Sequence, residues 1–287
     1  MGDLDAWLAD LSPLHCEYVT ELILRTPDFW LDHLSGVDSE SSRALLARNF
    51  WNLDVMARLE ELLAAGRGVA DGMAEIIALC FRLNPHPHWD RFRDLPIEAD
   101  LDPLAVWLET AFAHPPDHEI SGLWFGLFNP TRDDGEPTSD IYVCGSPYDP
   151  QDTDWACAVT WKPRGAYAGS TVLDRIYSQA YPLHQAYAHS SDEQTNTYNA
   201  EIAELLTNDA EYALCLSYGC LSMRSLINLA SPALILGNEA IRRAIFVGFD
   251  DGDRICLGLL THQGLQPFTD GDPISWPTVR PPMRSAD

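Results

Sequence analysis

Two histidines and an aspartate lie close together in the segment His86-Pro87-His88-Trp89-Asp90. Imidazole nitrogens and carboxylate oxygens are ligands that zinc accepts, and metal-dependent hydrolysis is the chemistry they would support. Such a site needs further ligands placed by the fold, whereas the prolines here predict a connector between helices. We interpret the segment as a structured loop and predict no metal site and no cofactor, with a metal-dependent hydrolase as an alternative function.

A nucleophile with a histidine base is the second chemistry that the residue types allow. The candidate nucleophiles are Ser146, Cys157 and Cys220, and the candidate bases are His184, His189 and His262. The nucleophile-elbow pattern GxSxG does not occur, nor do the glycine-rich patterns that bind nucleotide phosphates. The sequence therefore selects no pair, and we predict no catalytic residue, while a Cys/His hydrolase stays an alternative.

The acidic run Asp250-Asp251-Gly252-Asp253 contains the carboxylates that calcium prefers. An EF-hand loop would need a glutamate at its twelfth position, where this chain has Thr261. Aspartate and glycine also adopt the backbone angles of tight turns. We interpret the run as the turn of a β-hairpin.

The densest set of carboxylates lies between Asp133 and Trp161, a stretch with no lysine or arginine. Most of them fall in two loops, 129–139 and 146–154, which flank a predicted strand from opposite ends. Charge beside aromatic rings is typical of a protein-binding surface, because charge favours association and selectivity while rings supply buried area. The predicted partner-binding residues are Asp133, Asp134, Glu136, Tyr148, Asp149, Asp152, Asp154 and Trp155. The alternative is a solvated set of acidic loops.

The whole chain is acidic, with 18 Lys+Arg against 43 Asp+Glu and a net charge of −25. Such a field repels nucleic-acid backbones and anionic membrane surfaces and attracts basic proteins, although charge also maintains solubility. A hydrophobic content of 46% predicts a folded chain. The seven cysteines form no CxxC pair, and no secretory signal begins the sequence, so we expect a cytoplasmic protein with reduced thiols. The oligomeric state stays open.

Hydrophobic spacing predicts an α+β fold, with a helical N-terminal bundle over 1–115 followed by a mixed α/β region over 116–287 that contains an antiparallel sheet. Helices are expected over 13–34 with a break near Pro27, 39–66, 70–83, 103–112, 171–181 and 196–229 with a break near Asn208. Strands are expected over 122–128, 140–144, 155–161, 244–249 and 255–260. The last two form a hairpin with one buried face, and a proline-rich tail follows from Gln266.

Two segments carry a family resemblance, namely IYVCGSPYDPQDTDWACAVTWKPRGAYAGSTVLDRIYS from Ile141 to Ser178 and VGFDDGDRICLG in the predicted hairpin. They resemble segments of bacterial immunity proteins encoded near polymorphic toxin systems, over about a third of the chain. The resemblance implies a cytoplasmic protein that binds and blocks a toxin, and it assigns no catalytic residue.

The resulting hypothesis is an acidic binding protein that neutralises a basic toxin or effector by direct association. Two other classes remain open: the metal- or Cys/His-dependent hydrolase, and a non-catalytic structural or adaptor protein whose acidity maintains solubility.

Overall fold

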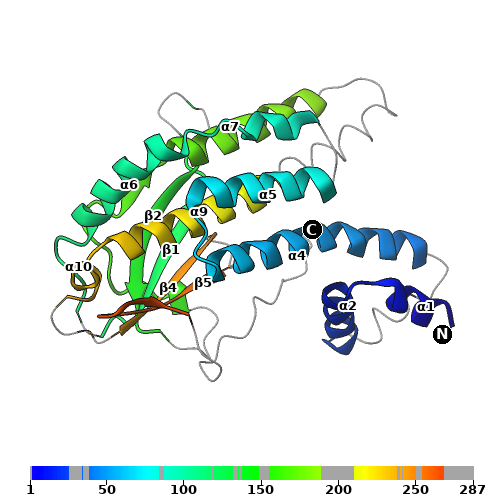
Figure 1. Cartoon of the computed structure of the whole chain (residues 1–287), viewed down its shortest axis with the longest axis horizontal. Coiled ribbons are helices and arrows are strands. Elements are labelled where there is room, and N and C mark those ends of the chain that lie inside the picture. Colours follow the sequence, from blue (N-terminus) through cyan, green and yellow to red (C-terminus); the bar gives the residue numbers. More distant parts are fainter. Residues whose placement is uncertain are drawn as a thin grey trace.

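The chain forms helices packed on one mixed sheet in the computed structural model (Figure 1). The structure describes residues 2–25, 34, 39–83, 87–117, 119–131, 135, 138–148, 155–188, 210–237, 240, 242–249 and 254–267. The predicted α+β class is confirmed. Within the described residues, no helix combines the length and the apolar character that a bilayer-spanning segment needs.

The helices are α1 (Gly2–Asp10), α2 (Pro13–Arg25), α4 (Ser39–Ala64), α5 (Val69–Leu83), α6 (Ile97–Ala111), α7 (Thr171–Ala188), α9 (Ala210–Leu229) and α10 (Pro232–Leu236). In the described ranges, the short 3-10 helices are η1 (Pro87–Phe92) and η2 (Trp155–Cys157). The strands are β1 (Gly122–Phe128), β2 (Asp140–Ser146), β3 (Tyr167–Gly169), β4 (Arg242–Phe249), β5 (Arg254–Thr261) and β6 (Gly264–Gln266).

The six-stranded sheet has the order β3-β2-β1-β4-β5-β6 and is mixed, which corrects the expectation of an antiparallel sheet. The hairpins β1–β2 and β4–β5 are antiparallel as predicted, but β1 and β4 join them side by side in parallel. Parallel neighbours need a long crossover connection, which α7 and α9 provide here. The sheet therefore consists of two antiparallel hairpins, each extended by a short edge strand.

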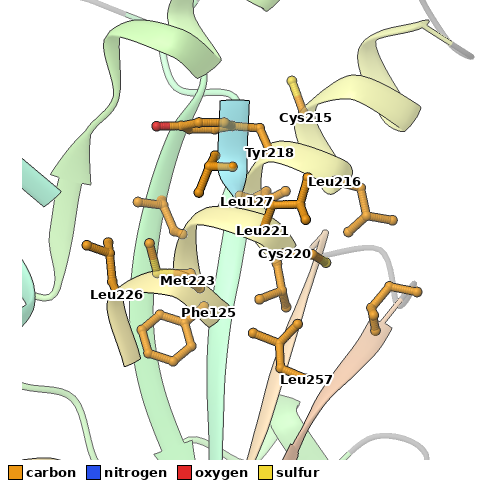
Figure 2. Close-up of a cluster of buried hydrophobic side chains, with 14 of the residues drawn as sticks. Phe125, Leu127, Cys215, Leu216, Tyr218, Cys220, Leu221, Met223, Leu226 and Leu257 are labelled. Carbon is orange, nitrogen blue, oxygen red and sulfur yellow. The ribbon is translucent and has the colours of Figure 1, made fainter. Parts of the chain in front are cut away.

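Helix α9 is the centre of the main hydrophobic core. It packs on β1, β4 and β5 on one side and contacts α4, α5, α6 and α7 as well. Figure 2 shows its Leu221 and Met223 beside Phe125 and Leu127 of the sheet. Because α9 has neighbours on several sides, nearly all its side chains from Ala213 to Met223 are buried, a pattern expected of a core helix.

The predicted N-terminal helical region contributes to two separate cores. Leu4, Val19, Leu22, Leu34 and Phe50 form a small cluster in which α1, α2 and part of α4 pack together. The later helices, from the second half of α4 through α6, join the main core that also contains the sheet. In Figure 1, α1 and α2 lie to one side of the molecule, away from the sheet. Whether residues 1–115 form a unit of their own stays a prediction.

Several individual elements agree with the sequence. The helix expected over 39–66 is α4, that over 70–83 is α5, and the hairpin expected over 244–260 is β4–β5. The strand expected over 155–161 is wrong, because residues 155–157 form η2 and only Trp161 makes an isolated bridge, to Gly145. The tail was predicted from Gln266, but Gln266 is the last residue of the edge strand β6. The rest of the predicted tail from residue 268 onward, and the predicted turn 250–253, lie outside the described residues.

Both faces of the β4–β5 hairpin are buried, whereas one buried face was expected. Ile245 and Val247 face the main core, and the alternate residues Ala244 and Phe246 belong to a third cluster on the opposite side of the sheet. We call this opposite side, with Trp124, Cys144 and Phe246, the second face.

A β-bulge in β5 depends on glycine. Ile245 pairs with Gly258 and Phe246 with Cys256, so Leu257 is the extra residue. Gly258 has a φ of 139°, and a Cβ there would lie 2.3 Å from the carbonyl oxygen of Gln266. No side chain fits this position without displacing the edge strand β6.

Gly258→Ala is expected to lower the free energy of unfolding by about 2–3 kcal/mol, because it adds a backbone clash to a strained φ. The matched control is Gly264→Ala, which has a positive φ of 103° but nothing within 4 Å of its added Cβ, and should cost about 1 kcal/mol. Urea unfolding of both variants measures the difference. Equal losses would show that the contact with Gln266 contributes nothing.

Candidate binding surface

Most of the predicted partner-binding residues lie outside the described residues, namely Asp133, Asp134, Glu136, Asp149, Asp152 and Asp154. Trp155 begins η2, with its side chain outside the described part, and Tyr148 is described and half-buried. The structure therefore describes where the two acidic loops begin and end, and these positions define the candidate surface.

The first loop, 129–139, is closed at its base by Thr138. Its backbone N–H donates to the carbonyl oxygen of Pro130 at 2.9 Å, and its hydroxyl donates to Asp174 Oδ1 at 2.7 Å. Asp174 lies in the first turn of α7. The base of this loop is thus fixed to a helix of the main core.

The second loop leaves β2 after Ser146 and returns through η2. Its Tyr148 packs on the ring of Phe246 with centroids 5.2 Å apart, and its backbone N–H donates to Ser121 Oγ at 2.7 Å. Helix η2 contacts β1 and β2, and its Ala156 packs against the second-face cluster. Both ends of this loop therefore lie on the second face of the sheet.

An aromatic patch lies on the same face at the β3 edge, formed by Phe128, Tyr142 and Tyr167 together with Lys162. Tyr167 packs on Phe128 at 5.3 Å and on Tyr142 at 5.7 Å between centroids, and its side chain is 53% exposed. Lys162, the only lysine of the chain, lies 4.3 Å from the Tyr167 ring centroid in a cation–π contact. The patch was not predicted from the sequence, although a lone lysine five residues before a tyrosine could have indicated this contact.

The two acidic loops join β2 at opposite ends, since Phe128 pairs with Asp140 and Gly122 pairs with Ser146. Seven strand residues span about 20 Å. A partner surface of standard size covers about 800 Å² on each protein, which is wide enough to contact both loop bases and the aromatic patch between them.

A buried carboxylate fixes the helix that holds the first loop. Asp100 of α6 is 2% exposed and accepts hydrogen bonds from Ser170 Oγ, Thr171 N, Thr171 Oγ1 and Tyr218 Oη, all at 2.6–2.7 Å. Three of these donors, from Ser170 and Thr171, lie at the N-terminus of α7, where a negative charge also complements the helix dipole. Burial and the Asp100 charge raise the pKa of Tyr218, so its phenol stays a donor.

A buried arginine fixes the segment that leads into β1. Arg243 of β4 is fully buried, and its guanidinium donates to the carbonyl oxygens of Pro116, Asp117, Ile120 and Leu236. Burial lowers its pKa to about 10, which leaves it protonated at neutral pH. The acceptors are backbone oxygens, so this side chain organises the chain rather than a ligand.

The candidates for metal and nucleophile chemistry occupy different elements. His86 lies outside the described residues and the side chain of His88 is likewise not described, while Asp90 forms an ion pair with Arg93 at 2.9 Å. Among the described residues, no group of three histidine, cysteine or acidic side chains could hold a metal ion.

The candidate nucleophiles lie in different elements of the fold. Ser146 ends β2 and is buried, Cys157 is exposed in η2, and Cys220 lies in the main core, where burial raises the pKa of its thiol. Among the candidate bases, His262 is exposed between β5 and β6, His184 lies in α7 and His189 falls outside the described residues. Cys215, in the same helix α9 as Cys220, is also buried.

No family model, curated protein or solved structure matches this chain.

Proposed function

We propose that this chain is a cytoplasmic, acidic binding protein that neutralises a basic toxin or effector by direct protein–protein association. The observation that carries the proposal is the stretch from Asp133 to Trp161, which has seven acidic and no basic residues in a chain of net charge −25. The resemblance to bacterial immunity proteins in the segment from Ile141 to Ser178 supports the same function. None of the seven cysteines, all of which lie in the described ranges, forms a disulfide bond, which agrees with a reducing compartment.

The geometry supports different contributions to binding from the acidic loops and from the aromatic rings. The bases of both acidic loops are held by the sheet and by α7, so the loops start from fixed positions at opposite ends of β2. Tyr167, half exposed beside Phe128, supplies a rigid aromatic side chain that a partner can bury. Acidic loops would accelerate encounter with a basic partner, and the rings would slow its dissociation.

The test is affinity purification of the tagged chain from its native host at low salt, followed by a salt wash and mass spectrometry. We expect one basic protein that elutes with salt, because attraction between exposed charges is screened. Co-expression of that protein with this chain should then restore growth that the partner alone arrests.

Two triple variants that each remove three negative charges distinguish the effect of the acidic loop on binding from the effect of net charge. Neutralising Asp149, Asp152 and Asp154 to asparagine should weaken binding of the captured protein by about tenfold at low salt. The control neutralises Asp71 and Asp102 to asparagine and Glu109 to glutamine, exposed residues of α5 and α6, and should leave affinity nearly unchanged. Equal effects of the two triples, or recovery of the chain alone, would contradict the proposal.

A further inference from the structure

A cavity of about 790 Å³ lies between α5, η1 and the start of α6, distant in sequence from the acidic loops. Its size falls within the range of small-molecule sites, about 300–1,000 Å³. Residues of α5, η1 and α6 line it, and both α5 and α6 are labelled in Figure 1.

The walls of the cavity are mostly apolar. Helix α5 contributes Ala70, Ala74 and Ala78, one residue per turn, together with Met73 and Ile77 from its buried side. Small side chains at three successive turns leave room along the helix. Phe81, Phe92 and Leu95 complete an apolar wall, and Phe81 is 37% exposed at the rim.

The part of the cavity wall that the start of α6 forms is suited to an anion. Pro96, Ile97, Glu98 and Ala99 line it, and they form the N-terminus of the 15-residue helix α6. No side chain caps this terminus, and within the described residues the backbone N–H groups of Glu98 and Ala99 have no hydrogen-bond acceptor. Free N–H groups and the helix dipole together favour a negative charge at this position.

Two arginines line the same cavity, although the chain as a whole is strongly acidic. Arg82, in the last turn of α5, forms no ion pair within the described part of the chain, and Arg93 is bound to the exposed Asp90. Glu98 is the one acidic side chain among the described lining residues, and it is exposed. The charge of the lining is therefore opposite to that of the protein.

We propose that this cavity binds a small amphiphilic carboxylate of the fatty-acid class. The apolar body lies along the alanine face of α5, and the carboxylate accepts hydrogen bonds from Arg82, Arg93 and the N-terminus of α6. Charge-assisted hydrogen bonds of this kind are about twice as strong as neutral ones. The site is independent of the proposed partner-binding surface.

The test is calorimetric titration of the full chain at neutral pH with decanoate and with decan-1-ol, which has the same chain length and no charge. We expect one decanoate per chain, bound about tenfold more tightly than the alcohol. Arg82→Gln should reduce the affinity for decanoate to that for the alcohol and leave the alcohol unaffected. Arg164→Gln, an exposed arginine outside the cavity, is the matched control and should change neither.

Filling the cavity tests the apolar part. Ala74→Phe, at an exposed position of α5, should abolish binding of both compounds while circular dichroism stays that of the parent chain. The proposal would be overturned by equal affinity for decanoate and decan-1-ol, or by an unchanged decanoate affinity in Arg82→Gln. It would equally be overturned if several molecules bound per chain and still bound to Ala74→Phe, or if no binding heat were detected.

Discussion

Replacing Asp100 with alanine is expected to lower the free energy of unfolding by about 3–5 kcal/mol, because it leaves several buried donors without an acceptor. Ser170, Thr171 and Tyr218 all direct polar hydrogens at this carboxylate, and each orphaned group costs about 1–3 kcal/mol. Figure 2 shows the Tyr218 hydroxyl pointing away from the leucine cluster around it, and this hydroxyl donates a hydrogen bond to Asp100 Oδ2 at 2.6 Å.

Urea unfolding at neutral pH measures this loss, and two variants define its cause. Asp102→Ala changes an exposed carboxylate on the same helix and should cost less than about 0.5 kcal/mol. Tyr218→Phe removes one donor together with its bond and should cost about 1 kcal/mol. If Asp100→Ala behaved like Asp102→Ala, the hydrogen-bond network would have no energetic role.

Replacing Arg243 with alanine should destabilise the chain by a similar amount, about 3–5 kcal/mol. The guanidinium is the donor for carbonyl oxygens of the segment 116–120 and of α10, and its removal leaves buried acceptors and a cavity. Arg243→Lys should restore only part of the loss, because one ammonium group lacks the planar fork that reaches oxygens on two segments. Thermal unfolding of both variants provides the comparison.

The adjacent residue supplies the control for Arg243. Arg242 carries the same charge one position earlier in β4 and is exposed, so Arg242→Ala should stay within about 0.5 kcal/mol of the parent chain. A loss in Arg242→Ala as large as that in Arg243→Ala would mean that charge, and not the buried contacts, accounts for the effect.

Local patterns predicted those parts of the fold that local interactions determine. The sequence of the β4–β5 hairpin has alternating apolar residues on both sides of an acidic, glycine-containing run. The sequence of α4 starts with the helix-start signal Asp38-Ser39 and is followed by Gly66. The parallel pairing of β1 with β4 joins residues more than a hundred positions apart, and no local pattern encodes it.

The strand predicted over 155–161 is wrong for a related reason. Alternating aromatic and small residues in this segment are typical of a strand, but β3 occupies the place beside β2, and Val159 is exposed. No sequence pattern identifies Asp100 as the centre of a hydrogen-bond network, because its partners Ser170 and Tyr218 lie 70 and 118 residues away. The acidic loops were found from composition alone, whereas the aromatic patch beside them depends on the pairing of β2 with β3.

The central position of α9 has a consequence for synthesis of the chain. Helices α5 and α6 leave the ribosome long before α9, yet their apolar faces are buried in the core that α9 completes. Until residues 210–229 and the β4–β5 hairpin have been translated, the core lacks both its central helix and half of its sheet. The nascent chain therefore carries exposed apolar helices for much of its elongation, a stage at which exposed apolar surface favours aggregation and a high net charge opposes it.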